Sequence, residues 1–299
     1  MKNRILITGH SGQLGLELAS SLAPLGDILT PNSQEFNLGQ PDQLRDYLDQ
    51  HRPNFIVNAA AYTAVDAAET HASLAYAINE NAPAVLAAWC QAHQATLVQY
   101  STDYVFGDTQ AQPYDETAIM GALNTYGASK AAGEMAVRAA LPNHYIFRVS
   151  WLYSATGNNF LRTMLRLAQE RTQLSIVHDQ IGAPTSCRLV ADVTAHVLLA
   201  QIRGQTNHFG TYHLTAKGAV SWYDFTQYIV KTAIEANLPL TLTPKNIKPI
   251  PSSDYPTPAQ RPRYSCLDCN KIETTFGLTL PDWRLGVRQA THQLLRSKL

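Results

Sequence analysis

A glycine-rich segment near the N-terminus constrains the fold of this chain more than any other feature. It lies between a predicted strand, Arg4–Thr8, and a predicted helix, Gln13–Leu25, and reads Gly9-His10-Ser11-Gly12-Gln13-Leu14-Gly15. Glycines lack a Cβ atom, so the backbone can approach a phosphate closely, and the amides at a helix start attract its negative charge. Between a strand and a helix, this spacing predicts binding of a dinucleotide through its pyrophosphate. Elsewhere it would indicate only a tight turn.

The first 150 residues alternate short apolar stretches with helical patterns. This order is typical of a parallel sheet whose strands are joined by crossover helices. The predicted strands are Arg4–Thr8, Asp27–Thr30, Phe55–Asn58, Thr96–Ser101 and Tyr145–Val149. The predicted helices are Gln13–Leu25, Asp42–His51, Ala72–Ala92 and Thr125–Ala140. We therefore predict an α/β fold with a Rossmann-like, doubly wound parallel sheet.

The pattern becomes irregular after residue 150. Helices are predicted at Phe160–Arg171, Arg188–Ile202, Tyr223–Asn237 and Gly286–Arg296, with short strands and a Pro-rich connection between them. We interpret residues 1–150 as a dinucleotide-binding domain and residues 151–299 as a smaller C-terminal α+β lobe for the substrate. Segments near 172–190 and 220–245 are expected to return to the sheet.

Composition excludes several classes of partner. The chain has 23 Lys and Arg residues against 23 Asp and Glu residues, so its formal net charge is zero. Nucleic acids and anionic membrane surfaces attract clustered basic residues, and we expect neither as a partner. The apolar stretches are shorter than the roughly 18 residues of a membrane-spanning helix, and we expect a cytoplasmic protein. The spacing of Cys90, Cys187, Cys266 and Cys269 predicts reduced thiols rather than a disulfide framework.

Tyr126, Lys130 and Thr102 form a candidate catalytic group. Tyr126 and Lys130 are four residues apart on a predicted helix and share one face. Thr102 ends the fourth predicted strand, at the sheet edge where open α/β folds bind ligands. The Lys130 ammonium is expected to lower the pKa of Tyr126, which can then exchange a proton with a carbonyl or hydroxyl oxygen. The Thr102 hydroxyl can polarise the same oxygen.

The sequence leaves the choice between NADH and NADPH open. An acidic residue at the end of the second strand usually indicates NAD, and a basic residue indicates NADP. The segment Leu29–Asn32 carries neither. After the third strand, the small side chains of Asn58-Ala59-Ala60-Ala61 can let a cofactor pass closely, but ordinary core packing explains them equally well.

The chain resembles the extended short-chain dehydrogenase/reductases and, within them, the dTDP-4-dehydrorhamnose reductases. The resemblance covers nearly the whole length. Beyond the glycine segment and the Tyr-Lys pair, the motifs that carry it are Asn58–Asp66, Ser101–Phe106, Tyr145–Tyr153, Gly157–Phe160, Asp179–Thr185 and Tyr255–Pro262. It implies reduction of the C4 ketone of dTDP-4-dehydro-6-deoxy-L-hexose (dTDP-4-dehydrorhamnose) by NADPH or NADH, giving dTDP-L-rhamnose.

The resemblance also implies roles for individual residues. Tyr126 would donate the proton, Lys130 would hold the nicotinamide ribose and tune Tyr126, and Thr102 would assist. The expected substrate-binding residues are Thr102, Asp103, Trp151 and Asn159. The expected cofactor-binding residues are Gly9, Ser11, Gly12, Gln13, Leu14, Gly15, Asn37, Leu38, Ala61, Tyr62, Thr63, Tyr100, Tyr126 and Lys130.

Two features depart from related enzymes. A nucleotide-sugar dehydratase needs a carboxylic acid directly after the Thr-Asp pair, and here Tyr104 stands there, which favours simple ketone reduction. Some family members hold magnesium between glutamates at a dimer contact. Glu17 matches one of these, but Arg188 and Gln293 stand at the others, and an arginine repels a cation. We expect no metal, and either a monomer or a homodimer.

Two alternatives stay open. A non-catalytic subunit can keep this fold and cofactor site, as the regulatory subunit of methionine adenosyltransferase does, although a binding protein has no need of Thr102, Tyr126 and Lys130 together. A reductase or epimerase for another nucleotide sugar would share all these residues, because the preferred sugar depends on pocket shape.

Overall fold

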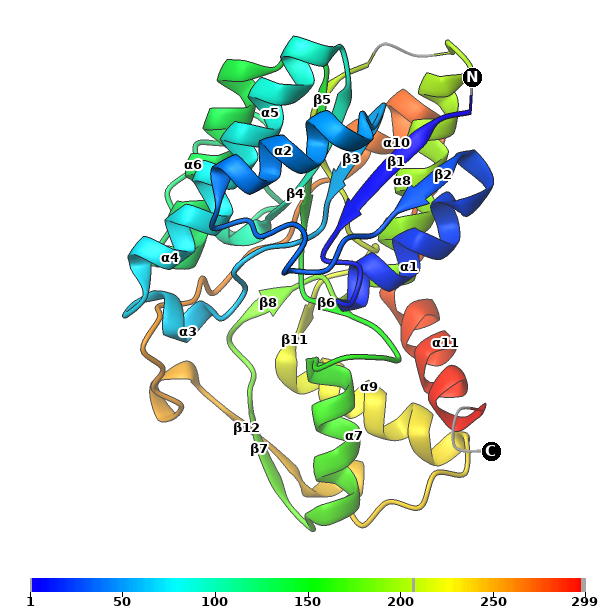
Figure 1. Ribbon diagram of the computed structural model, residues 1–299. Coiled ribbons are helices and arrows are strands. Elements are labelled where there is room, and N and C mark those ends of the chain that lie inside the picture. Colours follow the sequence, from blue (N-terminus) through cyan, green and yellow to red (C-terminus); the bar gives the residue numbers. More distant parts are fainter. Residues whose placement is uncertain (1, 206–207, 297–299) are drawn as a thin grey trace.

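A six-stranded parallel sheet forms the centre of the larger part of the molecule (Figure 1). The structure, a computed structural model, describes residues 2–205 and 208–296. The strand order is β2-β1-β3-β4-β5-β10, and every neighbouring pair is parallel. The strands are β1 (Arg4–Thr8), β2 (Asp27–Leu29), β3 (Phe55–Asn58), β4 (Thr96–Thr102), β5 (His144–Val149) and β10 (Gly210–His213). The order switches direction between β1 and β3, which is where open α/β sheets bind ligands.

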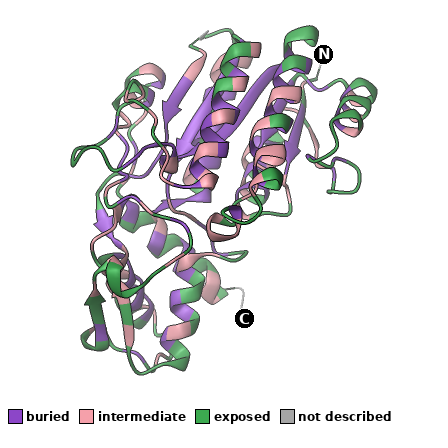
Figure 2. Ribbon diagram, turned by 90° about the vertical axis from the view of Figure 1, so that its left-hand side faces the viewer, coloured by how far each residue is buried: buried purple, intermediate pink, exposed green. Residues whose placement is uncertain are grey.

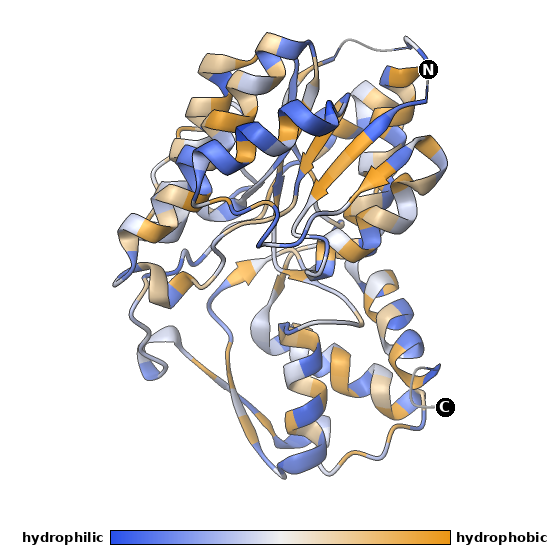
Figure 3. Ribbon diagram, viewed as in Figure 1, coloured by the Kyte–Doolittle hydropathy of each residue, from blue (hydrophilic) through white to orange (hydrophobic). Residues whose placement is uncertain are grey.

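The apolar sequences of the inner strands explain their position. Ile5, Leu6 and Ile7 in β1 are fully buried, and every residue of β3, β4 and β5 is buried as well. A strand covered on both faces needs an unbroken apolar run rather than an alternating one. Figure 3 shows β1 and β3 largely in orange, and Figure 2 shows buried strands between the helices.

Helices cover both faces of the sheet (Figure 1). One face packs against α1 (Gln13–Leu22), α8 (Cys187–Ile202) and α10 (Asn270–Phe276). The other packs against α2 (Pro41–His51), α5 (Ala82–His93) and α6 (Thr125–Ala140). The leucines at helical spacing in α1, Leu14, Leu18 and Leu22, all face the sheet and are buried. This burial of apolar surface on both faces holds the doubly wound fold together.

The smaller part lies beyond the C-terminal edge of the sheet (Figure 1). Its core gathers around Phe225 and Trp283. Its helices are α7 (Phe160–Glu170), α9 (Trp222–Glu235) and α11 (Trp283–Arg296). Its strands pair two by two: β6 (Leu152–Tyr153) with β9 (Thr185–Ser186), β7 (Leu174–Val177) with β12 (Ile247–Ile250), and β8 (Ile181–Gly182) with β11 (Val220–Ser221).

Short helical pieces complete the chain. The α-helical ones are α3 (Val65–Ala68) and α4 (Ala72–Tyr76). The others are η1 (Ala23–Leu25), η2 (Ala77–Asn81), η3 (Asp103–Val105), η4 (Pro244–Asn246) and η5 (Ser252–Asp254). Of these, η2 is a π-helical turn that joins α4 to α5. Among the described residues, no helix combines the length and the hydropathy needed to cross a bilayer.

The predicted fold class is confirmed, and helix α6 has the predicted bounds. Four details differ. The predicted helix 72–92 is interrupted by the π turn η2, and the predicted helix 13–25 tightens into η1 at its end. Sequence reasoning missed α10. The late segments that join or cover the sheet are α8, β10 and α10. In contrast, β7, β11, α9 and β12 pack within the smaller part, because β7 pairs with β12 and β11 pairs with β8.

Helix α6 packs so closely on η2 that residue 133 must be glycine. A Cβ atom there would overlap the carbonyl oxygen of Asn79, a backbone atom that cannot move aside. Alanine is the better helix former by about 1 kcal/mol, but the overlap outweighs this gain. We expect Gly133→Ala to lower the free energy of unfolding by about 1–3 kcal/mol in urea titrations. Gly121→Ala, where a Cβ atom meets only open space and one backbone nitrogen, is the control. Equal stability of the two variants would contradict the packing argument.

Candidate functional site

The glycine segment forms a tight turn between β1 and α1. Gly9 has a positive φ of 64°, and the Gly12 amide donates a hydrogen bond to the Gly9 carbonyl oxygen at 2.9 Å. A Cβ atom on Gly15 would overlap that same oxygen, so the helix can start here only with glycine. No side chain caps α1. Its first amides are therefore available to an anion.

The ends of β1 and β3 are tied together at the switch point. The Thr8 hydroxyl donates to the Asn58 side chain at 2.6 Å, and the Ala60 amide donates to the Thr8 hydroxyl at 3.1 Å. A Cβ atom on Gly9 would lie 3.0 Å from the backbone of Ala60. The small residues after β3 are therefore needed for the close passage of the glycine turn.

A cavity of about 650 Å³ extends from the glycine turn to the first turns of α6. The predicted residues that line it are Gly9, Ser11, Gly12, Gln13, Leu14, Gly15, Ala61, Thr63, Tyr100, Thr102, Tyr126, Lys130 and Trp151. Lining residues that sequence reasoning did not assign are Ala59, Ala60, Ser101, Val149, Leu152, Gly157, Asn158 and Cys187. Gly157 and Asn158 belong to the Gly157–Phe160 motif at the start of α7. That motif was the sequence signal that could have identified them as lining residues.

Five predicted residues lie outside this lining. The Asn37 side chain accepts the Gly39 amide in a surface turn, and Leu38 packs in the core under α2. The Tyr62 amide bonds to Asn79. Asp103 is buried behind Thr102. Asn159 caps α7 and donates to the Gln13 side chain at 2.8 Å, so it supports the glycine turn from the side of the smaller part.

Thr102, Tyr126 and Lys130 come together at the C-terminal edge of the sheet. Thr102 ends β4 and its hydroxyl is a hydrogen-bond partner of the Tyr126 phenol. Lys130 lies one helical turn after Tyr126, and its Nζ donates to the carbonyl oxygen of Tyr100 at 2.6 Å. The Tyr100 hydroxyl, in turn, is 2.7 Å from the Thr194 hydroxyl of α8. The predicted group is thus assembled on one wall of the cavity.

Burial controls the protonation of this group. It raises the pKa of Tyr126 to about 12, against a smaller lowering effect of the Thr102 hydrogen bond. It lowers the pKa of Lys130 to about 8, against the raising effect of Glu134. The expected net lowering of the Tyr126 pKa is wrong, because burial of the phenol outweighs the groups that would lower it. At neutral pH Tyr126 is a phenol and Lys130 is mostly charged.

Asp103 stands directly behind the Thr102 hydroxyl. It is 2% exposed and accepts hydrogen bonds from Thr102 at 3.1 Å and from Ser150 at 2.9 Å. Burial raises its pKa to about 6, although the hydrogen bonds from Ser265, Ser150 and Thr102 oppose that rise. The carboxyl group therefore orients the Thr102 hydroxyl and joins three segments beneath the cavity.

Trp151 is held in an unusual conformation at the border between the two parts. Its φ is 45°, which is uncommon for a bulky residue, and its indole stacks on that of Trp222 with ring centroids 3.4 Å apart. A Cβ atom on Gly182 would overlap the other side of the Trp151 ring. Because the indole is confined between Trp222 and Gly182, its position in the cavity wall is fixed.

An ion pair connects the C-terminal segment to the site. Arg261 makes a two-pronged contact with Asp66, with distances of 3.0 and 2.8 Å, and also bonds to Tyr104. The ring of Tyr104 meets that of Tyr126 edge to face at 6.0 Å. Sequence reasoning placed both ends in motifs but could not pair two residues 195 positions apart.

Acidic and basic side chains lie together at the place where we expected no metal, which is the place of Glu17, Arg188 and Gln293. The Arg188 guanidinium lies 2.9 Å from Asp192 and 3.8 Å from Glu17. Burial raises the pKa of Glu17, while Arg188 lowers it to a smaller extent. Gln293 lines the same hollow. In this group the arginine supplies the positive charge between the two carboxylates.

The whole chain is similar to one family of sugar-nucleotide reductases. The model of the RmlD substrate binding domain matches residues 2–296. The dTDP-4-dehydrorhamnose reductase of Burkholderia thailandensis is 45% identical over 297 residues, which cover 98% of this chain and 99% of the relative. The crystal structure of dTDP-4-dehydrorhamnose reductase from Bacillus anthracis in complex with NADP superposes with a TM-score of 0.89 at 35% identity. That match covers 98% of this chain and 100% of the other.

A relative with a different name matches over a similar length. It is a probable dTDP-4,6-dihydroxy-2-methyloxan-3-one 4-ketoreductase of Streptomyces antibioticus, and 36% of aligned residues are identical. The match covers 99% of this chain and 97% of the relative. Proteins similar to this chain thus include reductases named for two different keto sugars.

The confinement of Trp151 can be tested through its optical signal. Two stacked indoles couple strongly, so we expect a pronounced near-ultraviolet circular dichroism signal from Trp151 and Trp222. Gly182→Ala places a methyl group where the Trp151 ring lies, and we expect it to remove most of this signal. The far-ultraviolet spectrum should stay unchanged. Gly39→Ala, at a surface turn, is the control. Retention of the full signal in Gly182→Ala would show that the ring is not confined there.

Proposed function

Because the chain belongs to the dTDP-4-dehydrorhamnose reductase family, we propose that it reduces the C4 ketone of dTDP-4-dehydro-6-deoxy-L-hexose to the alcohol of dTDP-L-rhamnose. NADPH or NADH is the reductant. The observation that carries the proposal is the convergence of Thr102, Tyr126 and Lys130 on the same cavity as the glycine turn. A turn for a pyrophosphate and a proton donor on one cavity wall are the two parts that carbonyl reduction by a dinucleotide needs.

The residues present fit a dinucleotide. The turn at Gly9, Gly12 and Gly15 leaves no room for side chains beside its backbone, and the uncapped start of α1 can hold the pyrophosphate. Lys130 faces the same cavity and can hold the nicotinamide ribose. When bound there, the reduced nicotinamide supplies the hydride that becomes the new C4–H bond.

The protein supplies the proton and its orientation. Tyr126 keeps its proton at neutral pH, because burial raises its pKa to about 12. It can therefore give that proton to the ketone oxygen as the hydride reaches C4, so the oxygen becomes a hydroxyl and the phenol becomes a phenolate. The Lys130 charge favours this phenolate. The Thr102 hydroxyl, which donates to Asp103 in the ligand-free protein, can turn to donate to the ketone oxygen instead. Solvent then returns a proton to Tyr126.

The substrate contacts divide into two groups. We assign direct contact with the sugar to Thr102 and Trp151, which line the cavity. We assign Asp103 and Asn159 supporting roles, because Asp103 holds the Thr102 hydroxyl and Asn159 holds Gln13. We also propose that residues 151–299 form the substrate lobe, apart from the elements that cover or join the sheet. The protein is proposed to act as a monomer or homodimer.

A second candidate is reduction of a different dTDP-linked keto sugar. The similarity to the Streptomyces antibioticus relative favours it, and the residues around the ketone would be the same. The two candidates differ in the hydroxyl pattern that the cavity accepts, so comparing kcat/KM for several dTDP-keto sugars separates them.

Removal of the Tyr126 hydroxyl tests the proposed chemistry. We expect the purified protein to oxidise NADPH or NADH when the dTDP-4-keto sugar is added, and Tyr126→Phe to lower kcat by about 100-fold or more. Cofactor affinity, measured by quenching of protein fluorescence, should change little. Tyr255→Phe, which alters an exposed tyrosine, is the control. If the native protein shows no turnover with either cofactor, the non-catalytic alternative is favoured instead.

The pH dependence follows from Lys130. Its charged form predominates below a pKa of about 8, and Tyr126 stays protonated throughout the working range. We therefore expect kcat/KM for reduction to be highest near neutral pH and to fall as pH rises through about 8. Lys130→Arg keeps a positive charge at high pH, so its weaker activity should lack this fall. Activity that increases up to pH 10 in the native protein would contradict the assignment.

A further inference from the structure

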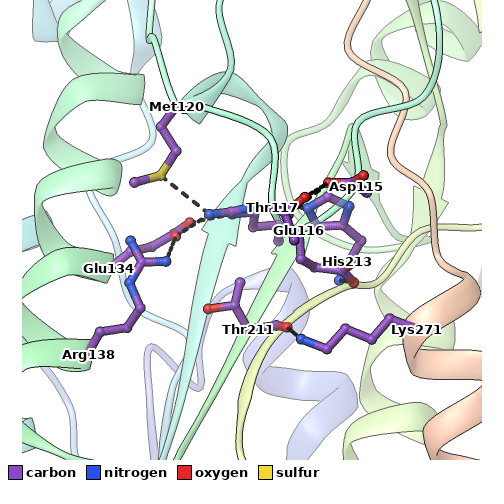
Figure 4. A network of polar contacts seen from close by, with 10 residues as sticks. Asp115, Glu116, Thr117, Met120, Glu134, Arg138, Thr211, His213 and Lys271 are labelled. Atoms are coloured by element: carbon purple, nitrogen blue, oxygen red, sulfur yellow. Dashed lines mark hydrogen bonds and ion pairs between the residues drawn. The ribbon is translucent and has the colours of Figure 1, made fainter.

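A buried ion pair fixes helix α6 to the sheet (Figure 4). Glu134 of α6 and Arg148 of β5 have side chains that are 0% and 1% exposed. The Arg148 Nε and Nη2 groups donate to the two Glu134 carboxylate oxygens at 2.9 and 2.7 Å. Two parallel hydrogen bonds define both the distance and the orientation of the partners. They therefore set how α6, which carries Tyr126 and Lys130, lies on the sheet.

The rest of the guanidinium is surrounded by neutral groups. Its Nη1 group lies 3.2 Å from His213 Nε2, and its Nη2 group lies 3.3 Å from the Met120 sulfur. The Phe106 ring lies 5.0 Å from its central carbon. Burial and, to a smaller extent, Arg148 lower the pKa of His213 to about 3. The imidazole is therefore neutral, and Glu134 supplies the negative charge beside Arg148.

Glu134 also lies on the same helix face as the catalytic group. It follows Lys130 by four residues and Tyr126 by eight, so the three side chains succeed one another along α6. Lys130 is 4% exposed. Burial lowers the pKa of its ammonium, and Glu134 is the charged group that opposes this effect. The Glu134 carboxylate thus serves two buried cations, Arg148 and Lys130.

We propose that Glu134 is a positioning residue for the reduction: its carboxylate holds α6 in register through Arg148 and keeps the buried ammonium of Lys130 charged. This inference rests on the proposed function of Lys130. It explains why a buried charge pair is present here. Stability alone does not require such a pair, because apolar side chains of similar volume often anchor a helix equally well. A carboxylate one turn from Lys130 stabilises the charged form of the lysine, and an apolar pair cannot do this.

Other ionisable groups near Lys130 do not replace Glu134. Asp103, on η3, raises the pKa values of Tyr104 and Tyr126, and neither Asp103 nor Tyr104 is among the groups that alter the pKa of Lys130. Arg148, on β5, would oppose a second positive charge, but Glu134 pairs with it directly. Glu80, on η2, is not among the groups that alter the pKa of Lys130. Arg138, one turn further along α6, lies 3.3 Å from Glu134 and is exposed.

The test removes the charge and keeps the shape. In Glu134→Gln we expect the Lys130 ammonium to lose its proton more easily, so the midpoint of its titration should fall from about 8 by roughly one to two pH units. Carbon-13 NMR of labelled lysine in the ligand-free protein measures this midpoint directly. The descending limb of kcat/KM should move to lower pH by the same amount. The NMR arm needs no turnover, so it is independent of the proposed reaction.

Three further variants separate charge from folding. Glu134→Asp keeps the charge, and its Lys130 midpoint should stay near that of the native protein even if its stability falls. Glu134→Gln combined with Arg148→Gln leaves no unpaired charge at the contact between α6 and β5, so this variant should fold even if the single variant does not, and its Lys130 midpoint should still be lower. Glu170→Gln, from an exposed pair on α7, should have no effect. An unchanged Lys130 midpoint in folded Glu134→Gln or in the double variant would overturn the proposal.

Discussion

The close passage of Gly9 beside Ala60 is the contact on which the rest of the site depends. β1 and β3 are neighbours, and the chain leaves them in opposite directions, so their ends form a crevice at the switch point. The positive φ of Gly9 turns the chain into α1 while its backbone lies against Ala60. A larger residue at either position would close the crevice. The proposed dinucleotide site, the start of α1 and the floor of the cavity all follow from this contact.

The second wall of the cavity comes from segments that are distant in sequence. Asn159 reaches Gln13 across 146 positions, and Arg261 reaches Asp66 across 195. These contacts lock the smaller part against the sheet edge, so Trp151 faces the same space as Tyr126. Much of the site's shape therefore depends on a few polar contacts between the two parts rather than on one continuous core.

Local patterns made part of this structure predictable. The strand–glycine–helix order gave the switch point, and the Tyr-Lys spacing placed the catalytic group on α6. Long-range contacts were not readable, because β7 pairs with β12 through residues 73 positions apart. The surface turn that contains Asn37 could not be read from the sequence either. The pKa of Tyr126 was misjudged, since the sequence shows that a lysine is near but not that the phenol is buried.

That misjudgement identifies the physical problem the site has to solve. Burying Tyr126 suits a proton donor, because it keeps the phenol protonated. The same burial weakens Lys130, whose charge is useful only if it persists at neutral pH. The same buried environment thus keeps Tyr126 protonated and makes Lys130 lose its charge more easily. A carboxylate placed one turn beyond the lysine corrects the second effect without disturbing the first, because Glu134 is two turns away from Tyr126 and its charge is shared with Arg148.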